Sequence, residues 1–260
     1  MPKDVQAIAG IGLQHVVDYQ DIEYGDEYLQ HLGKFLSIDT PAQHYKLSQT
    51  AAKYIANAMC YDDIIRVADL KTRASRNQRL RQEQQTTENQ MVQVTEYFHP
   101  RAQEICGTLP AWLGGWIENS SIAFSLLDKL VNKGRRVRTD KITGFGTLWL
   151  VSAMKPGRRK LLRHHHEKNH LTQLTDTAFT AAQTDYQLAV EVLTCQRVIK
   201  GYSDTHARGQ SKFGVLMESV PGILAGNQAV THLVALRDIA LKNESAEFLQ
   251  QQAILIEAEH

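Results

Sequence analysis

The residues His166-Glu167-Lys168-Asn169-His170 have the spacing H-E-x-x-H. On a helix, residues four apart share a face, so two imidazoles can bind one zinc ion while the glutamate activates water. No third ligand is evident, and the inner lysine is unfavourable beside a divalent cation. The surrounding run RRKLLRHHHEKNH favours a solvated basic helix face. We therefore expect no metalloprotease centre, and at most an adventitious surface metal at His166 and His170.

A second group of polar side chains lies in KGYSDTHARG, residues 200–209, where one helix is expected to end at a glycine. Asp204 can cap the following helix and orient His206, and Arg208 can clamp a carboxylate. A purely structural network that joins two helices explains the same residues, and this interpretation is favoured. Lys200, at the start of the turn, belongs to the same candidate cluster.

A similar cluster lies in TEYFHPR, residues 95–101, at a predicted strand-to-helix junction. Pro100 is suited to the first position of a helix, which leaves Glu96 and His99 near the helix N-terminus. A structural role leads here too. The catalytic residues stay unknown, and the candidates are Glu96, His99, Lys200, Asp204, His206 and Arg208.

Cofactor-binding motifs are absent from the sequence. The three cysteines, Cys60, Cys106 and Cys195, are widely scattered and form no C-x-x-C pair, whereas an iron–sulfur cluster normally takes four thiolates. We expect each to be a buried, inert thiol. No G-x-G-x-x-G, P-loop, G-x-S-x-G or thiamine-type motif occurs. We therefore expect no cofactor to be bound within this chain.

The composition is that of an ordinary globular protein, with 260 residues, 43% of them hydrophobic, and a net charge of +1. The two basic runs, Lys71–Arg81 and Arg158–Arg163, lack interleaved aromatic residues, so a solvated or subunit-contacting face is favoured over a nucleic-acid site. No apolar segment is long enough to span a bilayer, and the first residues do not resemble a signal peptide. We expect a cytoplasmic protein.

Most of the chain has helical periodicity, so we predict an all-α fold, a bundle of long helices with at most a small two-stranded β element. Thr40-Pro41-Ala42-Gln43 resembles a capping box, and the absence of Gly and Pro predicts one long helix over 42–87. A second helix is predicted over 185–200, with an N-terminal extension that starts near residue 158. Further helices are expected at 4–18, 22–36, 100–107, 120–132, 204–219, 226–242 and 244–258.

The alternating residues 91–98 and the segment 135–139 are the two predicted strands. The glycine-containing segment 144–157 is the expected boundary if the single domain, residues 1–260, comprises two subdomains, 1–143 and 158–260.

Four sequence segments occur in an order that resembles a known family. They are YDDIIRVADLKTR (61–73), VTEYFHPR (94–101), GRRVRT (134–139) and KGYSDTHARG (200–209). Together with VDYQD at 17–21, they resemble the C-terminal region of the indolepyruvate ferredoxin oxidoreductase family, in its beta-subunit and fused forms. The resemblance runs from about residue 17 to about residue 217, and the H-E-x-x-H segment lies within this range but in none of the motifs that carry it.

The resemblance implies an accessory domain within a larger multidomain enzyme, of which this chain is a fragment. That family oxidatively decarboxylates aryl-pyruvates with thiamine diphosphate and iron–sulfur clusters, which other domains or subunits hold. The implied partners are those domains and, indirectly, ferredoxin, with no nucleic acid and no membrane. The alternative is a freestanding helical interaction module, which could bind nucleic acid through the two basic runs.

Overall fold

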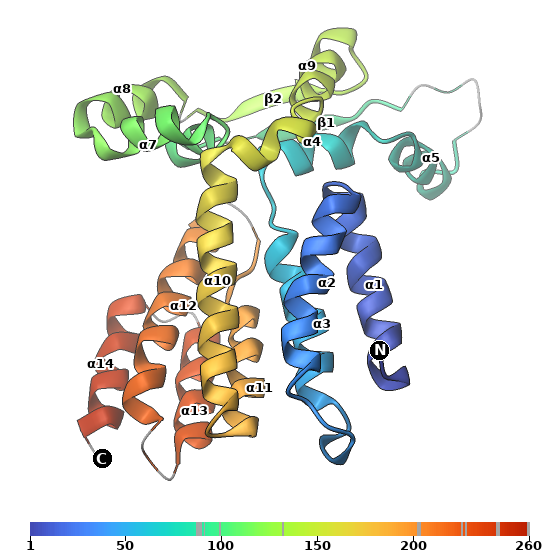
Figure 1. Ribbon diagram of the computed structural model, residues 1–260. Helices are drawn as coiled ribbons and strands as arrows, with labels where there is room; N and C mark the ends of the chain where they lie inside the picture. The colour runs from blue at the N-terminus through green and yellow to red at the C-terminus, as the bar shows by residue number, and fades with distance from the viewer. Residues whose placement is uncertain are drawn as a thin grey trace. The chain divides into compact units, whose positions relative to one another are not determined.

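The computed structural model describes residues 1–86, 90, 92–98, 100–131, 133–201, 204–224, 226, 228–242 and 245–258, without the side chains of residues 135, 204 and 256–258. Its described part is mainly helical and contains a two-stranded sheet, which confirms the predicted fold class. The chain divides into two compact units (Figure 1). Unit 1 comprises Met1–Tyr61 and Glu167–His260, and unit 2 comprises Asp62–His166.

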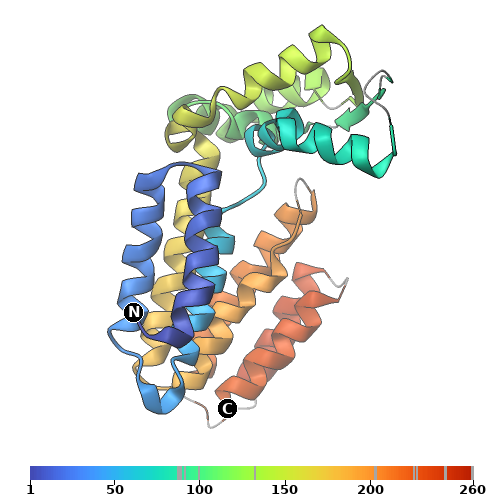
Figure 2. The same cartoon turned by 90° about the vertical axis from the view of Figure 1, so that its right-hand side faces the viewer.

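Unit 1 is a helical bundle. Helices α1 and α2 pack on each other and on α3, and α11 links α3 to a group formed by α12, α13 and α14 (Figure 2). Helix α10 begins in unit 2 and enters unit 1 at Glu167. The elements are α1 (Lys3–Tyr19), α2 (Ile22–Leu36), η1 (Pro41–Gln43), α3 (Lys46–Met59), α10 (Leu162–Ala182), α11 (Tyr186–Thr194), η3 (Cys195–Val198), α12 (Asp204–Ile223), α13 (Ala229–Leu241) and α14 (Ala246–Ala258).

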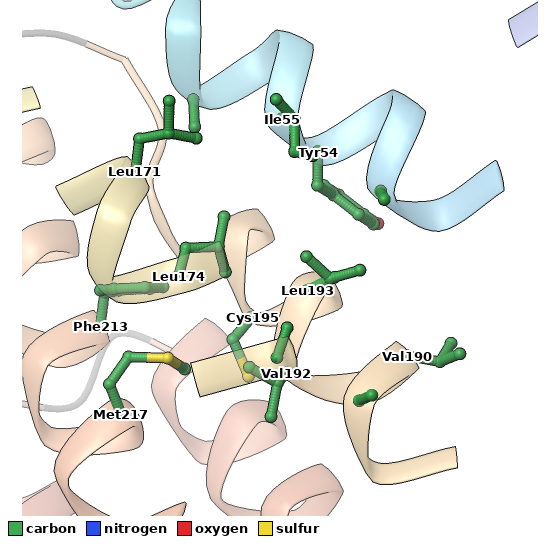
Figure 3. Packing of buried hydrophobic residues seen from close by; sticks show 14 of the residues in the cluster. Tyr54, Ile55, Leu171, Leu174, Val190, Val192, Leu193, Cys195, Phe213 and Met217 are labelled. Atoms are coloured by element: carbon green, nitrogen blue, oxygen red, sulfur yellow. The ribbon is translucent and has the colours of Figure 1, made fainter. Parts of the chain in front are cut away.

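The large hydrophobic core lies in unit 1, where helices remote in sequence supply it. In Figure 3, side chains of α3, α10, α11 and α12 point toward one another around Cys195. Burial raises the pKa of the Cys195 thiol to about 12, as expected for an inert core cysteine. A buried hydroxyl also joins two helices of the core: Tyr28 of α2 donates to the carbonyl of Ala52 in α3 at 2.9 Å. Packing between the N-terminal helices α1–α3 and the C-terminal helices α10–α14 therefore stabilises the bundle.

Unit 2 contains shorter helices and the sheet. Strands β1 and β2 pair antiparallel, with Thr95 opposite Arg138, as predicted. Helix α9 packs on α4, and α6, α7 and α8 pack together. The elements are α4 (Ile64–Thr72), α5 (Ala74–Glu83), β1 (Thr95–Phe98), α6 (Ala102–Gly107), α7 (Ala111–Asn119), α8 (Ser121–Val131), β2 (Arg135–Arg138), α9 (Ile142–Ser152) and η2 (Lys155–Lys160).

The predicted long helix over 42–87 is wrong, because the chain breaks into α3, α4 and α5. Asp63 is extended, and its carboxylate accepts a hydrogen bond from the Arg66 backbone N–H at 2.6 Å, which caps α4. The same carboxylate accepts from the Nε of Arg158 at 2.9 Å, and the Arg158 side chain is only 1% exposed. Breaking a buried ion pair is strongly destabilising, because one charge is left buried without its partner. The pair with Arg158 therefore helps to hold Asp63 in place at the break between α3 and α4.

The start of that helix also differs from the prediction. Thr40 makes no side-chain capping bond, and the proline turn after it is only a short 3-10 segment. His44 and Tyr45 then adopt left-handed backbone conformations, with φ near 50°. The regular helix therefore begins at Lys46.

The segment 144–157 is not the boundary between the units, which lies at 61/62 and 166/167. It forms most of α9 and the start of η2 instead. Gly144 lies so close to β2 that an added Cβ would be 2.0 Å from the Arg138 carbonyl oxygen. Glycine at this position therefore allows α9 to approach β2 closely within unit 2.

The predicted helix over 185–200 is shorter in the structure. Asp185 caps α11 by accepting from the Leu188 N–H at 3.0 Å, which separates it from α10, and α11 ends at Thr194. Gly201 has a φ of 66°, as expected for the glycine after a helical segment. No helix in the described part of the chain is both long and apolar enough to cross a membrane.

Candidate functional site

A buried polar cluster in unit 1 joins two segments that the sequence analysis treated separately. Its members are Glu167 and His170 of α10, Gln196 of η3, and His206 and Gln210 of α12; we call it the His–Glu cluster. The Glu167 Oε1 lies 3.0 Å from the Nε2 of His206, and the Gln210 amide donates to the same oxygen at 3.2 Å. The Nε2 of His170 lies 2.7 Å from the Gln196 Oε1.

The His–Glu cluster is enclosed by the bundle. The side chains of Glu167 and His206 are each 4% exposed, and His170 packs edge-on to the Phe213 ring with centroids 4.2 Å apart. A carboxylate and an imidazole can exchange a proton, but a substrate would have no direct route to them from solvent. The arrangement therefore supports cross-linking of α10 to α12 and η3, the structural role that was favoured for His206.

Two other candidates of the 200–209 segment, Lys200 and Arg208, do not join this cluster. Both are exposed, whereas His206 points inward. The side chain of Asp204 lies outside the described residues, as does His99. Lys200, His206 and Arg208 lie within one short segment of the sequence, but among these three only His206 is buried.

Glu96, the remaining candidate, is a buried residue of β1. Its two carboxylate oxygens accept hydrogen bonds from Lys71 of α4 and Arg76 of α5. The Lys71 ammonium also lies 5.6 Å from the centre of the Phe98 ring. Glu96 therefore ties the sheet to the helices before it, which is a structural role.

The H-E-x-x-H residues do not form one solvated face. His166 is half exposed, with its Nε2 3.8 Å from Glu118, whereas His170 is buried against Gln196. The expected solvated face is thus wrong for Glu167 and His170, because α12 and η3 cover that side of α10. Among the described residues, no group of three or more His, Cys, Asp and Glu side chains is placed to hold a metal ion.

The basic runs are largely engaged within unit 2. Besides Lys71 and Arg76, Arg73 pairs with Asp69 at 2.6 Å and Arg79 pairs with Glu83 at 3.5 Å. In the second run, Arg158 is buried against Asp63. These pairs reduce the number of cations available to phosphate groups and weaken the nucleic-acid interpretation.

A second polar cluster in unit 1 was not predicted. Asp39 accepts hydrogen bonds from the backbone and hydroxyl of Ser48, both at 2.8 Å, and from the Tyr186 hydroxyl at 3.0 Å. Burial is the main cause that raises the pKa of Tyr186 to about 12, so the phenol stays protonated. This cluster anchors the start of α3 to α11 and has a structural role.

The most unusual surface lies on unit 2, and the sequence analysis missed it. All three tryptophans of the chain are exposed there: Trp112 by 75%, Trp116 by 63% and Trp149 by 59%. Trp112 and Trp116 are one turn apart on α7, which packs beside α8 (Figures 1 and 2). Helix α8 exposes an apolar stripe of its own. We call the set Trp112, Trp116, Ile122, Leu126 and Leu130 the α7–α8 face.

A shallow depression of about 420 Å³ lies beside α9. Arg138 holds the carboxylate of Asp140 at its edge, and this hydrogen bond lowers the pKa of Asp140. The remaining wall is mainly apolar, with Trp149 on α9. The lining residues are Thr139, Asp140, Lys141, Ile142, Phe145, Gly146 and Trp149.

An iron–sulfur cluster, one of the groups implied by the family resemblance, does not fit the cysteines of this chain. Cys106 is buried in unit 2, whereas Cys60 and Cys195 lie in unit 1, and Cys195 is enclosed by the core. Three thiols in these positions cannot supply the ligands of an iron–sulfur cluster.

Comparison with known proteins gives a single family. Residues 5–219 match the family described as "Family of unknown function (DUF6537)". No curated protein and no solved structure matches the chain.

Proposed function

The chain belongs to the DUF6537 family, and we propose that it is an accessory domain of a 2-oxoacid ferredoxin oxidoreductase that acts on aryl-pyruvates such as indolepyruvate. In this proposal it binds no cofactor and packs against the domains that carry thiamine diphosphate and iron–sulfur clusters. Ferredoxin is an indirect partner, since it would receive electrons from those domains. The four ordered segments that resemble the indolepyruvate enzymes provide the substrate class.

The roles of the motif residues support a scaffold. Asp63 caps α4 and pairs with Arg158, Glu96 binds Lys71 and Arg76, and His206 binds Glu167. Three of the four motifs thus contribute bonds that hold secondary-structure elements together, and the buried residues among them are not open to a substrate. Such residues are needed for a rigid domain, whatever chemistry its neighbours perform.

The observation that carries the proposal is the exposure of large apolar side chains on unit 2. Isolated exposed hydrophobic residues are normal, but two tryptophans exposed one turn apart on α7, beside the exposed aliphatic residues of α8, are typical of a surface that another protein covers. An accessory domain needs such a surface, whereas a self-contained monomer does not.

The proposal is tested with the polypeptide that carries the thiamine and cluster domains of the oxidoreductase, produced without this chain. We expect the two to form a complex in size-exclusion chromatography, and the complex to reduce ferredoxin with an aryl-pyruvate faster or more stably than the polypeptide alone. If no complex forms at micromolar concentrations and the turnover and thermal stability are unchanged, the proposed function is wrong.

A further inference from the structure

We propose that the α7–α8 face is the docking surface of this chain and that its occupant is an acidic protein surface with apolar pockets for the two indoles. The inference rests on the proposed function, so the partner is the polypeptide that bears the thiamine and cluster domains. It goes further by assigning the contact to two helices and by specifying the charge of the partner.

The geometry of the face is suited to docking. Trp112 and Trp116 are spaced i, i+4 on α7, and the three aliphatic residues of α8 follow the same four-residue spacing, so each helix presents one continuous stripe. The aliphatic residues are exposed by 75%, 58% and 70%, in the order Ile122, Leu126 and Leu130. A helix normally turns such a stripe toward a core. Here both stripes face outward.

The exposed apolar area of the α7–α8 face is comparable to that at the centre of a protein–protein interface. A tryptophan buries roughly 150–250 Å² when covered, so the two indoles alone present on the order of 300 Å². The three aliphatic residues extend this area beyond the largest apolar patch of many monomers, which is roughly 300–600 Å². Tryptophans at the centre of an interface often contribute most of the binding energy.

Charge identifies the kind of partner. Between residues 111 and 134, the charged side chains that are exposed are Lys129 and Lys133, while Glu118 and Asp128 are half-buried. Unit 2 as a whole contains 18 Lys and Arg residues and 10 Asp and Glu residues, a net charge of +8. Unit 1 contains 11 Lys and Arg residues and 18 Asp and Glu residues, a net charge of −7. The net charge of +1 for the whole chain therefore conceals a strong difference between the two units.

Two exposed lysines on and just after α8, in a unit of net charge +8, favour a partner with carboxylates around apolar pockets. Pairing of the same face from two copies would bring like charges together and is disfavoured. The lysines would increase the association rate and make it sensitive to salt, whereas the indoles would slow dissociation.

The test compares variants of the full chain in binding to the thiamine- and cluster-bearing polypeptide, with isothermal titration calorimetry as the measurement. We expect W112A/W116A to weaken binding by roughly thirty-fold or more, because each indole is a candidate anchor. The matched control is W149A, which removes an exposed tryptophan from α9 of the same unit and is expected to change binding by less than about three-fold. Far-UV circular dichroism shows whether each variant is folded.

A second variant tests the charge of the partner. K129E/K133E is expected to weaken binding by roughly ten-fold at low salt and to reduce its salt dependence. Unchanged or tighter binding of this variant would overturn the acidic-partner inference, even if the tryptophan variant behaves as expected.

The outcomes separate the two proposals. If the wild-type chain does not bind the polypeptide, the proposed function fails and the docking inference fails with it. If the wild type binds and folded W112A/W116A binds equally well, the α7–α8 face is not the docking surface, while the proposed function stands. Two further results also overturn the inference: W112A/W116A abolishes binding to phosphatidylserine vesicles but not to the polypeptide, or it abolishes only self-association in sedimentation velocity.

Discussion

His206 and Arg208 are two residues apart on α12, yet only His206 faces the bundle interior. Its imidazole is bonded to Glu167, and both side chains are almost completely buried. We predict that His206→Ala lowers the free energy of unfolding by about 3 kcal/mol, because it leaves a buried carboxylate without that partner. Arg208→Ala, the matched control, should change it by less than about 0.5 kcal/mol. Urea unfolding followed by circular dichroism measures both.

Equal effects of these two substitutions would contradict a structural role for the His–Glu cluster. A large loss of oxidoreductase turnover in folded Arg208→Ala would instead indicate that the exposed Arg208 has a functional role. The two variants therefore distinguish a structural role of the buried His206 from a functional role of the exposed Arg208.

His31 of α2 is the residue for which we predict a pH effect. Burial, with a further contribution from Lys34, lowers the pKa of His31 below its ordinary value of 6.5. Its Nδ1 is buried and has no hydrogen-bond partner within the described part of the chain. The fold thus favours the neutral imidazole, whereas the unfolded chain takes up a proton near the ordinary value. The stability contribution of His31 is therefore lost as the pH falls below about 6.5.

The matched variant for this prediction is His31→Gln, which cannot titrate. Between about pH 7.5 and about pH 5.5, the wild type should lose more unfolding free energy than the variant, by less than about 1 kcal/mol because the ring is partly exposed to solvent. Urea titrations at the two pH values give this difference. A larger loss in the variant would show that the sign is wrong.

At the scale of elements, the glycines of α9 provide a direct comparison. An added Cβ at Gly144 would meet the Arg138 carbonyl at 2.0 Å, whereas one at Gly146 would meet nothing within 4 Å. Gly144→Ala should therefore destabilise the chain by roughly 2 kcal/mol, because β2 must move away from α9. Gly146→Ala should stabilise it by roughly 0.5 kcal/mol, since alanine favours helix. Thermal unfolding measures both changes: we expect Gly144→Ala to lower the Tm and Gly146→Ala to raise it.

The elements also show what the sequence can predict. Apolar periodicity was sufficient for the all-α class and for most helix positions, and strand composition predicted the β1–β2 pair. The break at Asp63 was missed because its N-cap signal was given less weight than the absence of Gly and Pro, and its pairing with Arg158, 95 residues away, is not visible in the local sequence. The link between His206 and Glu167 was missed for the second of these reasons: the two residues are 39 positions apart. Local patterns do not specify such long-range pairs.

The exposed face of unit 2 was missed for a different physical reason. The segment AWLGGWIEN has the composition of a core helix, and a sequence pattern does not state what covers an apolar stripe. Exposure is decided by the remaining elements of the unit, and α6 and α8 leave Trp112 and Trp116 uncovered. The candidate site therefore became visible only from the packing.

At the scale of the whole molecule, the two units differ in how much apolar surface they bury. The large core cluster lies within unit 1, whereas the buried apolar residues of unit 2 are few: Ile65, Ala68, Ala102, Cys106, Leu148, Leu161 and Leu162 among those described. Local stability follows buried apolar contacts. We predict that backbone amides of α4–α9 exchange with deuterium faster, by roughly ten-fold or more, than those of α1–α3 and α11–α13.

Hydrogen-exchange mass spectrometry tests this ordering and connects it to the proposed function. In the complex with the thiamine- and cluster-bearing polypeptide, peptides of α7 and α8 should become the most strongly protected, while peptides of the unit 1 core should change little, because they are already protected in the isolated chain. Faster exchange in unit 1 than in unit 2 would contradict the packing argument. Protection confined to α1 and α2 would show that the chain docks through unit 1, so that the exposed tryptophans serve another purpose.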